Sequence, residues 1–143
     1  MANSFWQKFY DLGEAAGARF PELVAAQAAL ESGWGLFVSG KNNYFGIKGS
    51  PGTVVTTREV YNGKEIYAVE AEFKNFANEL ECVQYLVDRW YKDYRDYKGV
   101  NRASTAQEAA HLLKAEGYAT DPVYPELLIG LMDENHAEEK QQE

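Results

Sequence analysis

Cysteine and histidine are scarce in this chain, which narrows the chemistry that it can perform. Cys82 is the single cysteine, so the chain can form no internal disulfide and cannot assemble a cysteine-based zinc site. The two histidines, His111 and His136, lie far apart in the sequence and have no clustered metal-binding partners. We therefore expect neither a catalytic metal nor any other cofactor.

Long hydrophobic runs and an excess of positive charge are absent as well. No stretch reaches the roughly 18 apolar residues that a membrane-spanning helix needs, so we expect no membrane insertion. The first residues contain no basic segment followed by an apolar run, which predicts synthesis in the cytoplasm without a signal peptide. Lys and Arg number 14 against 22 Asp and Glu, and no basic stripe is present, so nucleic acid is an unsuitable partner.

What the chain does contain is typical of one globular domain. Its 143 residues, of which 45% are hydrophobic and 25% charged, suit a single domain with its own core. We expect this domain to cover residues 1–132, to be followed by a polar acidic tail over 133–143, and to be a monomer. The aromatic fraction of 14% is high, and such side chains serve a core, ligand stacking or both.

Capping residues and apolar periodicity predict five helices. Pro21 suits the first position of a helix, and Gly33 suits the residue after its end. The other helices open at an N-cap residue or at a proline, two of them with the acidic residue of a capping box three positions later. The expected helix starts are Ser4, Pro21, Asn78, Thr105 and Pro125.

Two of these helices carry apolar stripes, and we expect the first of them to face the core. The first stripe repeats at helical spacing over four turns, and the second occupies one face of the last helix. They consist of Leu80, Val83, Val87, Trp90 and Tyr94, and of Leu127, Leu128, Leu131 and Met132.

A β-hairpin is predicted between the helices. Residues 53–61 and 64–73 are rich in β-branched and aromatic side chains, and they flank Asn62-Gly63, a dipeptide that strongly favours a two-residue turn. The order of elements is therefore helices, one hairpin, then helices. This order predicts an α+β fold, a mainly helical body with a small β-lobe at about 53–73.

The hairpin carries several carboxylates. A two-residue turn places Glu59 opposite Ile66, and strand alternation then puts Val55, Glu59 and Glu70 on one face. Glu65 falls on the other face, so only one of Glu59 and Glu65 can face a given cleft. Spacing alone does not choose between them, and charged side chains on a small hairpin are often only solvated.

Glu31 is the first candidate for acid chemistry. It falls in the last turn of a predicted helix, close to Trp34 and ahead of the glycine stop. The negative end of the helix dipole and an apolar neighbour both disfavour the carboxylate, and so raise its pKa. A carboxyl that stays protonated near neutral pH can act as a general acid. The alternative is a solvated carboxylate at a helix end.

Residues 118–124, Tyr-Ala-Thr-Asp-Pro-Val-Tyr, form a second candidate segment between two helices. Asp121 precedes a proline, which suits a turn. A tyrosine on such a loop could instead line a site.

Three segments together resemble one known family. They are Ala-Gln-Ala-Ala-Leu-Glu-Ser-Gly-Trp-Gly at 26–35, Asn-Asn-Tyr-Phe-Gly-Ile-Lys-Gly at 42–49, and the segment at 118–124. All three resemble motifs of the glucosaminidase domain of glycoside hydrolase family 73, in the family's order and with a hairpin between the last two. The resemblance covers about residues 20–132.

The resemblance implies a lysozyme-like α+β fold with a cleft between the helical body and the β-lobe. It implies an endo-β-N-acetylglucosaminidase whose partners are peptidoglycan glycan strands, cleaved at the β-1,4 bond between N-acetylglucosamine and N-acetylmuramic acid. The family's general acid is the Glu of its Leu-Glu-Ser-Gly-Trp-Gly motif, which falls on Glu31.

The same resemblance implies roles for other residues. The family's second carboxylate stands in a Thr-x-Glu context before the hairpin turn, which Glu59 matches, and the tyrosine of its Tyr-Ala-Thr-Asp-Pro motif falls on Tyr118. Tyr118 is expected to position the sugar or to stabilise positive charge on it. Trp34 fits either sugar stacking or core packing. The residues expected to bind substrate are Asn43, Phe45, Asp121 and Tyr124.

Two mechanisms suit this family, and the sequence does not decide between them. In one, Glu59 is the base that activates water for an inverting attack. In the other, the N-acetyl group of the substrate attacks the anomeric carbon. Alternative functions are a muramidase or a lytic transglycosylase acting on the same polymer, or a saccharide-binding module without turnover.

Many relatives carry a signal peptide and wall-binding repeats, which this sequence lacks, and this difference indicates a cellular setting. Without a signal peptide or wall-binding repeats, we expect a phage endolysin that reaches the bacterial cell wall through a separate pore protein. A catalytic domain excised from a larger autolysin would have the same sequence features.

Overall fold

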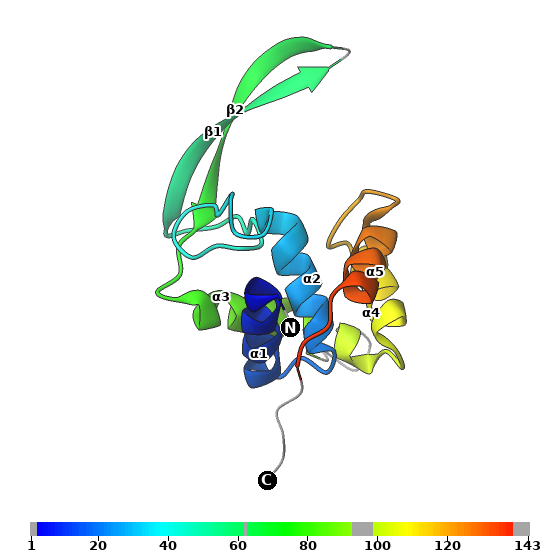
Figure 1. Cartoon of the computed structure of the whole chain (residues 1–143). Coiled ribbons are helices and arrows are strands. Elements are labelled where there is room, and N and C mark those ends of the chain that lie inside the picture. Colours follow the sequence, from blue (N-terminus) through cyan, green and yellow to red (C-terminus); the bar gives the residue numbers. More distant parts are fainter. Residues whose placement is uncertain (1–2, 62, 93–98, 139–143) are drawn as a thin grey trace.

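The computed structural model describes residues 3–61, 63–92 and 99–138, with the backbone alone described for 57–61 and 64–69. A two-stranded antiparallel hairpin rises from one side of a helical body, and α4 and α5 lie together on the other side (Figure 1). The elements are α1 (Ser4–Ala16), α2 (Pro21–Ser32), β1 (Gly52–Tyr61), β2 (Lys64–Lys74), α3 (Glu79–Leu86), the π-helical turn η1 (Val87–Tyr91), the 3₁₀ turn η2 (Val100–Arg102), α4 (Ala106–Ala115) and α5 (Tyr124–Glu134). The predicted α+β class is confirmed.

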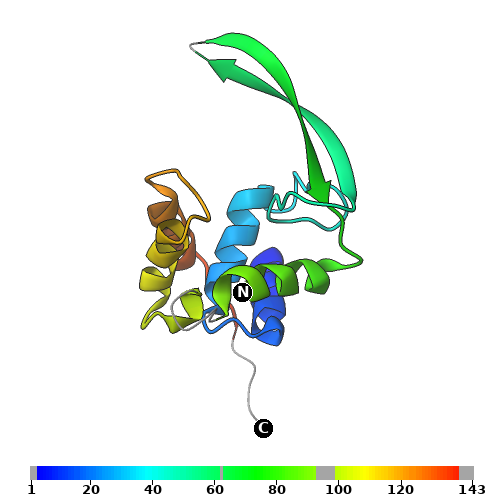
Figure 2. The ribbon, with the colours of Figure 1, turned by 180° about the vertical axis from the view of Figure 1, so that it is seen from behind.

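Helix α2 is the centre of the body, with α1 packed on one side and α5 on another. Figure 2 shows it from behind, between the base of the hairpin and the α4–α5 pair, with α3 crossing in front. Nine of its twelve residues are buried, so it is apolar on nearly all sides, as a central helix must be. The main core side chains around it are Trp6, Phe9, Leu23, Val24, Leu86, Val87, Tyr91, Leu113 and Leu128.

Helices α1 and α2 approach closely at a glycine. A Cβ placed on Gly13 would lie 2.9 Å from the Cβ of Val24, closer than side chains can pack. Gly13→Ala should therefore lower the free energy of unfolding by about 1 kcal/mol, because the overpacking cost exceeds the gain in helix propensity.

Gly130 in α5 is the matched control. No other atom of the described chain lies within 4 Å of a Cβ placed there. Gly130→Ala should raise the free energy of unfolding by up to about 1 kcal/mol. Denaturant midpoints measure both variants, and a stabilising effect of Gly13→Ala would show that the helices do not need this close approach.

Most predicted helix starts are confirmed, and one N-cap is wrong. The amide N–H of Glu81 donates to Asn78 Oδ1 over 2.8 Å, and that of Glu108 donates to Thr105 Oγ1 over 3.1 Å. Helix α1, however, is capped by Asn3, whose Oδ1 accepts from the amides of Phe5 and Trp6. Ser4 is the first helical residue, because the Asn3 side chain one position earlier already accepts from the two free amides of the first turn.

The two apolar stripes are only partly buried. Leu80 is 43% exposed and Leu127 is 45% exposed, whereas Val83 and Leu128 are fully buried. Both exposed residues stand in the first turn of their helices. Trp90 is half-buried at a cleft, and Tyr94 lies outside the described residues.

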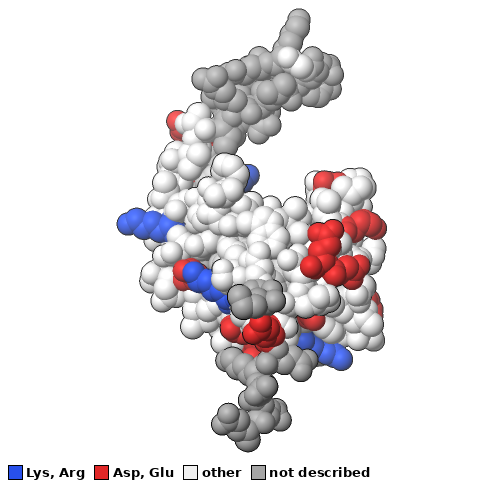
Figure 3. All heavy atoms as spheres, in the orientation of Figure 1, with Lys and Arg blue, Asp and Glu red and all other residues white. Residues whose placement is uncertain are grey.

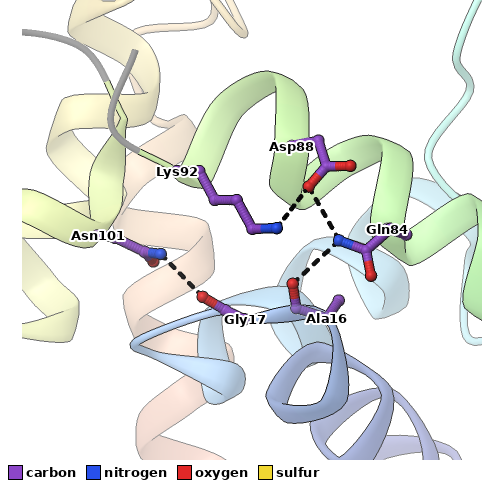
Figure 4. Close-up of polar contacts among 6 residues, drawn as sticks. All are labelled: Ala16, Gly17, Gln84, Asp88, Lys92 and Asn101. Carbon is purple, nitrogen blue, oxygen red and sulfur yellow. Dashed lines mark hydrogen bonds and ion pairs between the residues drawn. The ribbon is translucent and has the colours of Figure 1, made fainter. Parts of the chain in front are cut away.

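Helix α3 continues as η1, whose polar face is tied to the rest of the body. Gln84 Nε2 donates to the Ala16 carbonyl oxygen at the end of α1 and to Asp88 Oδ1, and Lys92 Nζ pairs with the same Asp88 oxygen at 2.8 Å (Figure 4). Close by, Asn101 Nδ2 donates to the carbonyl oxygen of Gly17. These contacts fix the rotation of η1.

The hairpin pairs as predicted at its turn but not beyond it. Tyr61 pairs with Lys64 as expected, but the register shifts after Val60, so that Glu59 pairs with Tyr67 and not with Ile66. The irregularity gives β2 one residue more than β1 and reverses the predicted alternation below it. Glu70 consequently lies opposite Thr56, and not on the face of Val55.

The end of the last helix differs from the predicted start of the tail. Helix α5 runs through Glu134, two residues into the segment expected to be a polar tail. The backbone of Glu138 then exchanges two hydrogen bonds with the side chain of Gln7 in α1. No helix in the described part of the chain is long and apolar enough to span a membrane.

Candidate active site

A cleft of about 610 Å³ opens beside the C-terminal end of α2. Four segments far apart in the sequence line it: the last turn of α2, the loop that precedes β1, the α3–η1 helix, and the loop that leads into α5. Its lining residues are Glu31, Phe45, Gly46, Ile47, Lys48, Tyr85, Arg89, Trp90, Tyr118, Ala119, Thr120, Asp121 and Tyr124.

Glu31 stands where α2 ends, with its side chain open to the cleft. Desolvation by the surrounding protein raises the pKa of its carboxyl, and a hydrogen bond with the Tyr124 side chain lowers it in part. Desolvation dominates because the apolar groups of the cleft stabilise the neutral form. The carboxyl therefore holds its proton to higher pH than an ordinary glutamic acid.

A tight turn directly after α2 positions Glu31. Ser32 Oγ donates to the Ala28 carbonyl oxygen and accepts from the Gly35 amide over 2.9 Å, which locks the turn. Gly33 ends the helix with a φ of +56°, a left-handed conformation that favours glycine. The Ser and Gly residues of this motif therefore build the helix end that carries the acid.

Trp34 packs away from the cleft. Its ring contacts Phe5 and Trp6 of α1, with centroids 5.6 and 6.2 Å apart. Of the two uses left open by the sequence, packing against the body is the observed one. Three successive left-handed residues turn the chain back over α1, and Trp34 is not among the residues that line the cleft with Glu31.

Aromatic side chains form the wall next to Glu31. The Tyr118 ring stacks on Tyr124 with centroids 5.8 Å apart, and meets Trp90 edge to face at 5.1 Å. Desolvation raises the pKa of both tyrosines, and the charge of Glu31 adds to the rise. Both hydroxyls therefore stay protonated. The Tyr124 hydroxyl is already bonded to the Glu31 carboxyl, so the Tyr118 hydroxyl is the one that can donate to a ligand.

A buried polar chain holds Tyr124 in place. Gln27 of α2 is fully buried, its Nε2 donates to the Tyr124 hydroxyl over 3.1 Å, and its Oε1 accepts from the Tyr91 hydroxyl. Three elements, α2, η1 and α5, thus meet at one amide. The sequence signal for this role was a polar residue within an otherwise apolar helix.

Asn43 lies beneath the cleft and not on its surface. It is 1% exposed, its Nδ2 donates to the carbonyl oxygens of Ile47 and Lys74, and its Oδ1 accepts from the amides of Phe45 and Ile47. A direct contact with substrate, expected from the sequence, does not suit this burial. Its amide is used instead to shape the loop that brings Phe45 to the cleft.

The structure places one of two other predicted site residues, Asp121, at the cleft, but it does not describe the side chain of the other, Glu59. Asp121 lines the cleft and its Oδ1 accepts from the Val123 amide, which is the turn expected before a proline. Glu59 belongs to β1, but its side chain lies outside the described residues.

Three lining residues lie outside the three segments that resemble the family motifs: Tyr85, Arg89 and Trp90. Lys48 lies within one of these segments, but the sequence does not predict a role for it. Trp90 was assigned to the core because its spacing fits the buried stripe. Within the described residues, no group of three or more His, Cys, Asp or Glu side chains could hold a metal ion.

The arrangement is suited to acid catalysis on a sugar. A protonated carboxyl can donate its proton to a departing glycosidic oxygen, as glycosidases require. Aromatic rings beside it offer flat surfaces for sugar rings, and the Tyr118 hydroxyl supplies a donor that orients the bound group.

Comparisons with known proteins agree with this chemistry. Residues 6–137 match the Glucosaminidase family, described as mannosyl-glycoprotein endo-beta-N-acetylglucosaminidase. The chain is 38% identical over 123 residues to the peptidoglycan hydrolase FlgJ of Salmonella typhimurium, covering 78% of this chain and 38% of that protein. It is 34% identical to the exo-glucosaminidase LytG of Bacillus subtilis, covering 83% of this chain and 45% of that protein. The chain thus spans less than half the length of these relatives.

Solved structures show the same fold. The C-terminally truncated glycoside hydrolase domain of Salmonella typhimurium FlgJ superimposes with a TM-score of 0.68 and 31% identity, covering 91% of this chain and 94% of that one. The catalytic domain of the autolysin Auto from Listeria monocytogenes gives a TM-score of 0.69 with 26% identity, covering 94% of this chain and 86% of that one.

Proposed function

We propose that this chain, which belongs to the Glucosaminidase family and is a glycoside hydrolase, cleaves peptidoglycan with Glu31 as its general acid. The bond is the β-1,4 linkage between N-acetylglucosamine and N-acetylmuramic acid, and cleavage leaves N-acetylglucosamine at the new reducing end. Relatives named as a peptidoglycan hydrolase and an autolysin catalytic domain support the choice of polymer.

The position of Glu31 in the cleft, where desolvation raises its pKa, is the observation that carries this proposal. It is the lining carboxyl whose pKa is raised, mainly by desolvation, and it stands beside two neutral tyrosines. Asp121, the other described acid of the lining, is held in a turn by the Val123 amide. The group best suited to protonate a leaving oxygen is therefore Glu31.

The remaining residues are assigned by their contacts. We place the sugar against the rings of Tyr118 and Tyr124, where the Tyr118 hydroxyl can orient the N-acetyl or ring oxygen atoms, with Phe45 as part of the floor. Asp121 at the rim is within the lining and can accept from sugar hydroxyls. Asn43 acts indirectly, through the shape of its loop.

The role of Glu59 depends on the hairpin. Glu59 stands seven residues beyond Gly52, which at roughly 3.3 Å per residue is about 23 Å along β1. No residue of β1 lines the cleft in the described part of the chain, so a Glu59 base requires that the hairpin reach the cleft in the substrate complex. Attack by the N-acetyl group of the substrate needs no such approach, so the two mechanisms make different demands on the hairpin.

The chemical end formed on purified peptidoglycan tests the proposed activity. Released fragments, reduced with borohydride and identified by mass spectrometry, should carry reduced N-acetylglucosamine. Reduced N-acetylmuramic acid would instead indicate a muramidase, and 1,6-anhydro ends a lytic transglycosylase. Absence of release from walls of several types would leave a saccharide-binding module.

A further inference from the structure

Two cations line the cleft without a carboxylate partner. Lys48 comes from the loop before the hairpin and Arg89 from η1, and both side chains are exposed to the cleft. Among the described residues neither forms an ion pair, whereas Lys8, Lys92 and Arg102 each do. The proposed acid chemistry uses neither of them.

The acidic groups next to these cations along the chain or across the strand pairing have other partners, as do the two acids of the cleft lining, Glu31 with Tyr124 and Asp121 with the Val123 amide. Asp88 precedes Arg89 in the chain, yet its Oδ1 is bound by Lys92 and Gln84, on the face of η1 tied to α1 (Figure 4). Glu72, next to the strand position that pairs with Lys48, accepts from the Ser50 hydroxyl. The two positive charges are thus left for a ligand.

An aromatic ring positions the Arg89 side chain, and an ordered loop positions the backbone at Lys48. The Arg89 guanidinium lies over the Trp90 ring at 4.4 Å from its centroid, and Trp90 in turn contacts Tyr118. Lys48 follows Ile47, whose amide and carbonyl groups are both bound by Asn43. Arg89 is therefore linked through two aromatic rings to the wall beside Glu31, within the lining of the same cleft.

We propose that Lys48 and Arg89 bind a carboxylate carried by the muramyl residue next to the cleaved bond. In intact wall this carboxylate belongs to the peptide stem. This inference rests on the proposed function. The sugar rings of the polymer are neutral, and the lactyl carboxyl is masked as an amide wherever a stem is attached, so anionic groups near the bond lie on the stem. A guanidinium fork and an ammonium group are the side chains that bind carboxylates best.

The charge of the whole protein makes this local arrangement meaningful. The chain carries a formal charge of −8, and Figure 3 shows Asp and Glu side chains gathered over α5. At long range such a protein repels an anionic polymer. Cations inside the cleft offset this repulsion at the site of cleavage, and their effect should weaken as salt screens the charges.

The first test is the double variant Lys48→Gln/Arg89→Gln on soluble peptidoglycan fragments with intact stems. Its KM should rise about fivefold to tenfold, because two exposed charge pairs are lost, with a smaller change in kcat. The double variant Lys48→Arg/Arg89→Lys keeps both charges and should recover most of the loss. Lys114→Gln, a lysine of α4 outside the cleft, is the control and should keep the wild-type KM.

Modified substrates separate charge recognition from damage to the cleft. When the stem carboxylates are converted to neutral amides, the wild-type KM should rise to that of the double Gln variant, and the two proteins should become alike. Amidase-treated strands lose the stem but expose the lactyl carboxylate. If the wild type keeps its lower KM than the double Gln variant on these strands, the ligand is the lactyl carboxylate. If the two KM values become equal, the ligand is the stem carboxylate.

The proposal would be overturned if the KM of the double Gln variant exceeded that of the wild type by the same factor on native and amidated fragments. It would also be overturned if the double Gln variant had the wild-type KM on native fragments. Failure of the proposed function is distinguishable, because the wild-type protein would then release no N-acetylglucosamine reducing ends from any of these substrates.

Discussion

Glu31→Gln should lower kcat on peptidoglycan by about 10²–10⁴-fold, the usual contribution of a positioned general acid. The amide keeps the shape of the side chain but has no proton to give to the leaving oxygen. Release of reducing ends from purified walls measures the effect. Retention of more than about a tenth of the activity would mean that another group protonates the leaving oxygen.

The stability of the same variant provides the control. Because the pKa of Glu31 is raised in the folded state, the folded protein binds this proton more tightly than the unfolded chain does. The contribution of Glu31 to stability is therefore present at low pH and is lost as pH rises through the raised pKa. Glu31→Gln should melt at or above the wild-type temperature at neutral pH, so lost activity with a lowered melting temperature would indicate misfolding instead.

Glu59→Gln should lower kcat by about 10²-fold or more if Glu59 activates the water. Glu65→Gln and Glu70→Gln are matched controls on the second strand, where Glu65 pairs with Val60 near the turn and Glu70 pairs with Thr56 toward the base. Both should keep activity within about twofold. A larger loss at either control than at Glu59 would move the second carboxylate to β2.

The anomer of the first product identifies the mechanism behind this result. Water activated by Glu59 attacks from the opposite face and inverts the anomeric centre, whereas participation of the N-acetyl group gives retention. NMR of a soluble substrate shows which anomer forms first. Inversion with an inactive Glu59→Gln fits the base, and retention with an active Glu59→Gln fits the assisted route.

The central helix and the hairpin were predictable because local residues determine them. Pro21 and Gly33 bound α2 through their own backbone preferences, and Asn62-Gly63 selects the turn between the strands. The shift beyond Val60 was not predictable, because it depends on how two strands pair and not on either strand alone.

The site was predictable where a residue acts through its own chemistry. Glu31 and Tyr118 line the cleft that the family motifs imply, whereas Trp34 does not. Trp90 packs partly against the core, as its spacing predicts, but it also lines the cleft, because periodicity identifies an apolar face without telling whether protein or a cleft covers it. The role of Gln27 was not predictable, since its two tyrosine partners come from distant parts of the chain.

The buried amide of Asn43 also bears on the entropy of binding. Its bonds to the backbone of Phe45, Ile47 and Lys74 fix the loop in the free protein, before any glycan arrives. Immobilising a flexible side chain at an interface costs about 0.5–1.5 kcal/mol, and ordering a loop adds to that. Folding has already met this cost for the floor of the cleft. The contacts made by Phe45 can therefore contribute to affinity without an opposing loss of loop freedom.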